Sequence, residues 1–238
     1  MVEKDFTKSQ MTDPAGIQLR QIPADLAIQF LMVSWKITKK NYEAVLQVSV
    51  LYVVILVAMS YTPFIMILAP LPATILGAGF MVFARKIVLG ERGSVKDLFT
   101  VFEDNQKMGD LVPIGLLGVG IALLQALIEK SFPAFIGNLI DFVLTLLLVA
   151  LTAFSAPLIY FKRVPAVRSI ELNLQATSLS WQFLLALGLM LAGLGVACTI
   201  ALVLPVVLVF LPVALVSGYL TYAALFEGLD IRKVDRKF

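Results

Sequence analysis

The stretch WQFLLALGLMLAGLGVACTIALVLPVVLVFLPVALVSGYLTYAALF, residues 181–226, contains no charged side chain in its 46 residues. About 20 apolar residues in a helix cross the ~30 Å hydrocarbon core of a membrane. The stretch is therefore long enough for two crossings, and Pro205 near its middle is a residue type that favours a turn. We predict one transmembrane helix over residues 181–203 and a second over residues 206–226.

The rest of the chain has a similar composition. Hydrophobic residues make up 60% of the 238 residues and charged residues 15%, against about 45–50% and 25% in a soluble domain. Further apolar stretches lie at residues 43–62, 64–84, 111–128 and 139–161. We therefore predict an all-α, polytopic membrane protein with six transmembrane helices. Several spans are interrupted by prolines, which predicts kinked helices packed against neighbours. These prolines are Pro70 and Pro72, Pro157, and Pro205 with Pro212.

Lysines and arginines lie almost entirely on one side of this predicted topology. Six spans place both termini on the same side, and every basic residue except Lys130 falls on that side. Because basic residues are enriched in cytoplasmic segments, we predict that both termini are cytoplasmic. Residues 1–22 are then expected to be a flexible cytoplasmic tail, residues 23–228 a single transmembrane domain, and residues 229–238 a basic cytoplasmic tail.

Three segments on the cytoplasmic side have the periodicity of amphipathic helices lying in the membrane interface. They are Ala24–Lys40, Ser94–Asn105 and Pro165–Ser178. Capping of the helix bundle is an equally good role for all three. The basic residues that adjoin these segments are candidate contacts for anionic lipid headgroups, and they are Lys36, Lys39, Lys40, Arg85, Lys86, Arg92, Lys162, Arg163 and Arg168.

The second of these segments lies in GERGSVKDLFTVF, residues 90–102. Its two glycines allow the chain to turn, and Ser94 followed three residues later by Asp97 fits a helix capping box. The spacing of the apolar residues after Ser94 predicts one helix face against the membrane, formed by Val95, Leu98, Phe99 and Phe102.

One interfacial helix followed by two spans occurs three times in this topology, which predicts a degenerate threefold repeat. The second span of each unit ends in GFMVFA (Gly79–Ala84), APLIYF (Ala156–Phe161) or GYLTYA (Gly218–Ala223), each with a small residue four positions before an aromatic one. Small residues at every fourth position predict close helix packing, within the chain or between copies. Two such stripes are Gly118, Ala122 and Ala126, and Gly193, Ala197 and Ala201.

The chain contains no histidine and a single cysteine, so it lacks the commonest general base and metal ligand. Cys198 lies in an apolar stretch, where a small buried side chain is expected. No phosphate-binding loop or metal-ligand spacing occurs, and a net charge of +3 along the membrane edge does not favour nucleic acid. We therefore expect a protein that is not an enzyme and has no catalytic residue, cofactor, metal or nucleic-acid partner.

Asp141 lies just inside the fourth predicted span, and an ionisable residue at membrane depth is a functional candidate. One interpretation is a proton or cation site at the end of a pathway. The neighbours expected there are Gln125, Glu129, Asn138 and Thr145. The alternative is that Asp141 lies at the interface, where it is hydrated or paired with Lys130.

Three stretches resemble those of a known group of proteins: GERGSVKDLFTVF, FSAPLIYFKRVPAVRSIELNLQATSLSWQFLL and LPVALVSGYLTYAALFEG. Over about residues 23–228 the chain is similar in pattern to uncharacterised bacterial six-span membrane proteins, and to the membrane domain attached to some glycerophosphodiester phosphodiesterases. The matching residues are Gly90, Asp97, Leu98, Phe99, Phe102, Pro157, Ala166, Trp181, Tyr219, Tyr222 and Phe226. The resemblance implies a bacterial inner-membrane location and carries no activity with it.

These patterns predict an integral inner-membrane protein that organises lipid or the cell envelope, or that serves as a component of a membrane complex. The expected partners are anionic membrane lipids, together with further copies of the chain or other proteins of a larger membrane complex. The alternative is a transporter or channel for a small or lipidic substrate, with Asp141 and the proline-containing spans forming its pathway.

Overall fold

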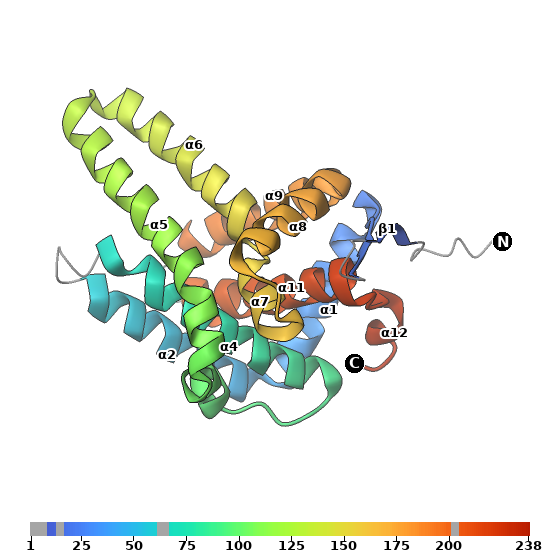
Figure 1. Ribbon diagram of the computed structural model, residues 1–238. Coiled ribbons are helices and arrows are strands. Elements are labelled where there is room, and N and C mark those ends of the chain that lie inside the picture. The colour runs from blue at the N-terminus through green and yellow to red at the C-terminus, as the bar shows by residue number, and fades with distance from the viewer. Residues whose placement is uncertain (1–8, 13–16, 61–66, 201–204) are drawn as a thin grey trace. The chain divides into compact units, whose positions relative to one another are not determined.

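The computed structural model describes residues 9–12, 17–60, 67–200 and 205–238, and almost all of these residues are helical (Figure 1). Within these described ranges, six helical segments are long and apolar enough to cross a membrane. The prediction of an all-α protein with six spans is therefore confirmed by length and composition. The six segments are α2 (Tyr42–Ser60), α4 (Pro70–Leu89), α5 (Asn105–Ser131), α6 (Ala134–Thr152) with α7 (Ser155–Lys162), α9 (Trp181–Ile200), and η3 (Val206–Phe210) with α11 (Leu211–Tyr222) and η4 (Ala223–Glu227).

The boundaries of the spans differ from the predicted ones by several residues. Helix α4 continues five residues past the predicted end at residue 84, and α5 begins at Asn105 rather than at residue 111. Parts of the predicted spans 43–62, 64–84 and 181–203 lie outside the described residues.

Shorter elements connect these spans. They are the strands β1 (Ser9–Thr12) and β2 (Gln18–Arg20), and the helices η1 (Ala24–Leu26), α1 (Ala27–Lys40), η2 (Val95–Glu103), α8 (Ala166–Leu179) and α12 (Ile231–Asp235). The two strands pair antiparallel within the segment expected to be a tail. Leu19 in β2 and the following Ile22 are buried. At the other end of the chain, Ile231 and Val234 of α12 are buried as well.

The chain divides into two compact units. The first consists of Met1–Val50, Met81–Val95 and Gln175–Phe238, and the second of Leu51–Phe80 and Lys96–Leu174. In the first unit, α1 packs against α9 and α11. The rings of Phe30 and Phe183 meet edge to face with their centroids 4.8 Å apart. The main-chain N–H of Ile22 donates to Oγ of the buried Ser180 at 3.1 Å.

The carboxyl-terminal segment of the first unit is also packed. Gly228 has a φ of +70° and ends η4. Beyond it, Lys36 forms an ion pair with Asp235 at 2.6 Å, and the ammonium of Lys237 donates to the carbonyl of Leu89. These contacts connect the segment predicted to be a basic tail to the ends of α1 and α4.

The core of the second unit gathers side chains from four helices, and it consists of Ile75 and Ala78 of α4, Val101 of η2, Leu111 and Ile114 of α5, and Ile159 of α7. Helix η2 enters this core because Gly79 of α4 lies directly against the carbonyl group of Leu98. The close approach requires a residue without a side chain at position 79.

The prediction of one membrane-facing surface on η2 is wrong for Leu98. Leu98 and Val101 are fully buried, whereas Phe99 and Phe102 are exposed. The prediction assumed 3.6 residues per turn, but η2 is a 3₁₀-helix, in which residues three apart lie on one face. Leu98 therefore shares a face with Val101, and Phe99 with Phe102.

Pro70, Pro157 and Pro212 each lie in the first turn of a helix. Pro70 begins α4, where its missing N–H is not needed. Pro212 follows a single π-helical turn, η3, and lies in the first turn of α11. Pro157 lies in the first turn of α7, just after α6 has ended at Thr152.

Candidate functional site

The candidate pathway residues lie in the second unit, on a hairpin in which α5 and α6 run side by side (Figure 1). Gln125 of α5 faces α6, and its Nε2 donates to Oγ1 of Thr145 at 3.0 Å and to the main-chain oxygen of Asp141 at 3.2 Å. Polar bridges of this kind hold helices together in membranes. The structure therefore brings Gln125, Asp141 and Thr145 together.

The carboxylate of Asp141 differs from the rest of this cluster. Its Oδ1 is buried and accepts no hydrogen bond from any described residue. Glu129, Lys130 and Asn138 are exposed, and none of the three bonds to Asp141 in the described part of the chain. A buried carboxylate oxygen without a donor is costly, so Asp141 is the residue of this hairpin that its local structure does not explain.

Asn173 is a polar residue that sequence reasoning missed. Its side chain reaches from α8 to the junction of α6 and α7, where Oδ1 accepts from the N–H of Phe154 at 2.9 Å. Its Nδ2 donates to the carbonyl of Ala150. Ala150 and Phe154 are four residues apart, the spacing of an α-helical hydrogen bond. The amide is thus inserted between two groups that would otherwise bond each other, which is an established cause of a helix break.

The sequence carried one signal for this contact. A proline within a span frees a backbone carbonyl, and a neighbouring helix must then supply a donor. Pro157 therefore indicated a break near residue 153, and the next helix along the chain contains one asparagine, Asn173.

The nine basic residues proposed to contact lipid differ in their partners. Lys36 pairs with Asp235 at 2.6 Å, and Arg85 lies 3.8 Å from Glu227. Arg168 pairs with Glu171, and Lys40 lies over the ring of Phe238. Lys86 is half-buried. The remaining four have exposed side chains without a hydrogen bond or ion pair to any described residue, and they are Lys39, Arg92, Lys162 and Arg163.

The two stripes of small residues have different surroundings. Gly118 is buried, and a methyl group there would lie 2.6 Å from Cβ of Pro70, so this residue packs within the second unit. Ala122 and Ala126 on the same helix are half-buried. In the other stripe, Gly193 has open space where a side chain would be, Ala197 is exposed, and Ala201 lies outside the described residues.

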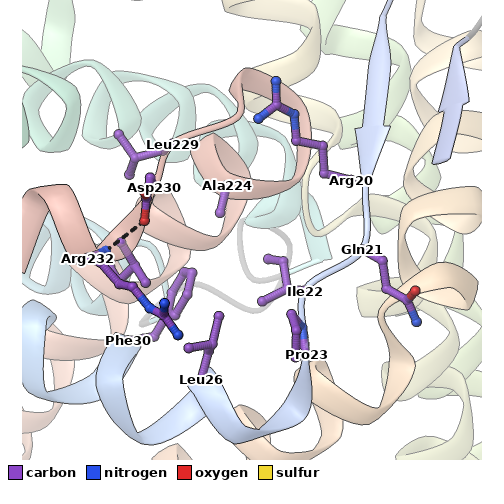
Figure 2. A pocket seen from close by; sticks show the side chains of 11 residues that line it. Arg20, Gln21, Ile22, Pro23, Leu26, Phe30, Ala224, Leu229, Asp230 and Arg232 are labelled. Carbon is purple, nitrogen blue, oxygen red and sulfur yellow. Dashed lines mark hydrogen bonds between the residues drawn. The ribbon is translucent and has the colours of Figure 1, made fainter. Parts of the chain in front are cut away.

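A small cavity lies in the first unit where β2, η1 and α1 meet η4 and α12 (Figure 2). Its volume is about 30 Å³, which is room for a water molecule or two. The guanidinium of Arg20 donates to the carbonyl of Gly228 at 3.4 Å and packs against the Cα of that glycine. Asp230 accepts from the N–H of Arg232 at 3.0 Å. The cavity is therefore a packing defect beside a chain turn, too small for a metabolite.

A larger groove lies on the same unit between α1 and the helices that it packs against. Its volume is about 330 Å³ and its wall is almost entirely apolar. The residues that line it are Leu31, Met32, Trp35, Leu194, Val209 and Val213. A cavity of this size is within the range of about 300–1,000 Å³ that binds small molecules.

Among the described residues, no group of three or more cysteine, aspartate or glutamate side chains could hold a metal ion. The chain matches no family model, no curated protein and no solved structure.

Proposed function

We propose that this multi-pass membrane protein is a non-enzymatic component of a bacterial inner membrane that organises lipid or holds other proteins in a membrane complex. The observation that carries the proposal is the apolar surface of the α5–α6 hairpin. Its side chains include Leu127, Phe135 and Phe142, which are 63%, 82% and 61% exposed. Apolar surfaces of this kind bind lipid or protein.

The distribution of charge supports the orientation in this proposal. Given six spans, all basic residues except Lys130 lie on the side of the two termini. Basic segments remain on the cytoplasmic side of a membrane and attract anionic headgroups. Both termini are therefore cytoplasmic, and the anionic lipids of that leaflet are the first partners.

The short helices support the predicted interfacial helices and the threefold repeat. Helices α1, η2 and α8 each precede two spans, so that the order of a short helix and two spans occurs three times. Each short helix has one buried face and exposed apolar side chains, such as Met32, Phe102 and Val167. Such helices can rest in the interface while they pack on the bundle. The proposal includes a relationship of this chain to the membrane domain attached to some glycerophosphodiester phosphodiesterases.

The non-enzymatic part of the proposal rests on how polar side chains are used. Gln125 and Asn173 bond to main-chain groups of neighbouring helices. Ser180 accepts from the N–H of Ile22. These contacts hold the fold together, and a chain without histidine has few other groups suited to acid–base chemistry.

The proposal is tested with the full chain purified into nanodiscs made from bacterial lipids. Native mass spectrometry then counts the copies of the chain and the lipids that stay bound, and crosslinking in cells identifies attached proteins. We expect self-association, retained lipid or a specific protein partner. A monomer that releases all lipid and crosslinks to nothing would contradict the proposal.

A transporter or channel is the second candidate, and the unpartnered Oδ1 of Asp141 is the observation that favours it. In this case Asp141→Asn abolishes flux of protons or monovalent cations into proteoliposomes, while Asn138→Asp on the exposed face of the same helix leaves it unchanged. Equal flux through the parent protein and Asp141→Asn would remove Asp141 from any pathway.

A further inference from the structure

Helix α1 forms one wall of the apolar groove of the first unit, and the exposed face of α1 ends at a basic residue. Along α1, the residues Ile28, Met32 and Trp35 are 51%, 59% and 44% exposed and follow one another at the spacing of a single helix face. Lys39 comes next in this series, four residues after Trp35 and seven after Met32. One stripe of α1 therefore consists of three exposed apolar side chains followed by Lys39, whose Cα lies about 6 Å further along the helix axis than that of Trp35.

The charged groups near Lys39 leave its ammonium available. Lys36, one turn earlier, is already paired with Asp235. Glu43 is four residues further on, but α1 ends at Lys40 and Asn41 leaves the helical conformation with φ −114°. In the described part of the chain, Lys39 and Glu43 form no ion pair. Lys40 adds a second positive charge at the same end of the helix.

We propose that this groove binds one acyl chain of an anionic phospholipid and that Lys39 pairs with the phosphate of its headgroup. A ligand for this site must be apolar along the wall formed by Met32, Trp35 and Val213, and negatively charged at the end of α1. A membrane phospholipid has this arrangement, and its chain is already in an apolar environment. Trp35 lies between the two regions, as indole side chains do at membrane interfaces.

The site deepens the proposed function, on which it rests for the placement of the chain in a membrane. It distinguishes one bound lipid from the lipids that surround any membrane protein. The groove fixes the chain, and Lys39 selects the headgroup by its charge. One lysine near an anionic surface supports a preference of about fivefold over a neutral headgroup.

Trp35 provides the measurement. The chain contains two tryptophans, so replacing Trp181 leaves the fluorescence of Trp35 alone. With Trp181→Phe as the background, fluorescence of Trp35 is recorded in mixed vesicles of phosphatidylglycerol and phosphatidylcholine, with one of the two lipids brominated in its acyl chains. Bromine quenches tryptophan at short range, so the ratio of quenching gives the lipid preference next to Trp35. We expect about a fivefold preference for phosphatidylglycerol.

Four variants locate the source of that preference. Lys39→Gln should reduce the ratio to about one, and Lys39→Arg should keep it. Lys130→Gln removes an equal charge from the end of α5, on the side opposite the two termini in the proposed topology, and should leave the ratio unchanged. Val209→Phe fills the groove and should abolish the preference although Lys39 is present. Circular dichroism and gel filtration check that each variant is folded.

Equal quenching by the two lipids in the parent protein would overturn the proposal, and so would a preference that persists in Lys39→Gln. If Val209→Phe keeps the preference, headgroup charge alone acts and the groove holds no chain. The outcome is separate from that of the proposed function. A chain that self-associates without lipid preference keeps the function and loses this site, whereas a selective chain that joins no assembly keeps the site alone.

Discussion

Replacement of Asn173 by alanine tests how this chain stabilises a break in a membrane helix. In the native structure, one side-chain amide bonds both to the N–H of Phe154 and to the carbonyl of Ala150. The variant removes both bonds. Interhelical hydrogen bonds in membrane proteins are worth about 0.6 kcal/mol each and at most about 1.7, while a buried main-chain group left without a partner costs about 1–3 kcal/mol. We expect a loss of about 1–3 kcal/mol in the free energy of unfolding.

The loss in the free energy of unfolding reaches the upper part of that range only if Pro157 is present. Without the amide, Ala150 and Phe154 could form the α-helical bond that their spacing allows, which would recover part of the loss. Pro157 opposes this repair. In a continuous helix it would offer no N–H to the carbonyl of Ala153, four residues earlier, and its ring would clash with that carbonyl. Pro157→Ala should therefore reduce the cost of Asn173→Ala to below about 1 kcal/mol. The two substitutions are thus expected to couple by about 1 kcal/mol or more, as residues in one network do.

The assay is reversible unfolding in mixed micelles, in which the folded fraction is followed by circular dichroism as the content of denaturing detergent rises. Asn138→Ala is the matched control, since Asn138 is exposed on α6 and has no hydrogen bond to a described residue. The reasoning is refuted if Asn173→Ala and Asn138→Ala have the same stability within 0.5 kcal/mol, or if the cost of Asn173→Ala is unchanged in the Pro157→Ala background.

Two further predictions concern the elements around η2. Gly79→Ala places a methyl group on the carbonyl of Leu98 and should destabilise the protein by about 2–3 kcal/mol. Gly77→Ala, with open space at that position, should be neutral or stabilise the protein by up to about 1 kcal/mol. Equal stability of the two variants in the same micelle assay would contradict this account of the η2–α4 contact. The hydrogen bond from the N–H of Lys107 holds the pKa of the Asp104 carboxyl below its ordinary value of 3.8, so the stabilisation of the first turn of α5 is present above that ordinary value and is lost as the pH falls through the lowered pKa. Protection of this turn against hydrogen exchange should decline on acidification in the native chain but not in Asp104→Asn, and an equal decline in both would exclude Asp104 as the titrating group.

The spans could be predicted because each rests on a local property, the length of an apolar run. The contact of Gln125 with Asp141 was also within reach, since the two residues lie at similar distances on either side of the turn at Phe132 and Pro133, and Thr145 is one helical turn beyond Asp141. The arrangement of Arg20 over Gly228 was not, because 208 residues separate them. Nothing in the local sequence of either segment indicates the other.

The misplaced face of η2 has a different origin. Val95, Leu98, Phe99 and Phe102 fit the i, i+3, i+4, i+7 series of an α-helix, and Val101 does not belong to that series. In a helix with three residues per turn, Val101 rather than Phe99 lies on the same face as Leu98. Gly79, which lets η2 approach closely, lies in the span α4. The group that it contacts is the main-chain carbonyl of Leu98, and every residue has such a group. The choice between the two periods was therefore made by a tertiary contact.

Most polar side chains inside the bundle have a main-chain group as their partner. Asn173 bonds at the break between α6 and α7, and Ser180 at the junction of α8 and α9. Gln125 bonds in the part of the hairpin close to the turn between α5 and α6. Each of these contacts satisfies backbone or joins helices, so each is explained by folding alone. The carboxylate oxygen of Asp141 has no such explanation among the described residues. A pathway for protons or cations uses an ionisable group that folding does not, and a purely organising protein needs none. Asp141 is therefore the position at which substitution separates the two proposed functions.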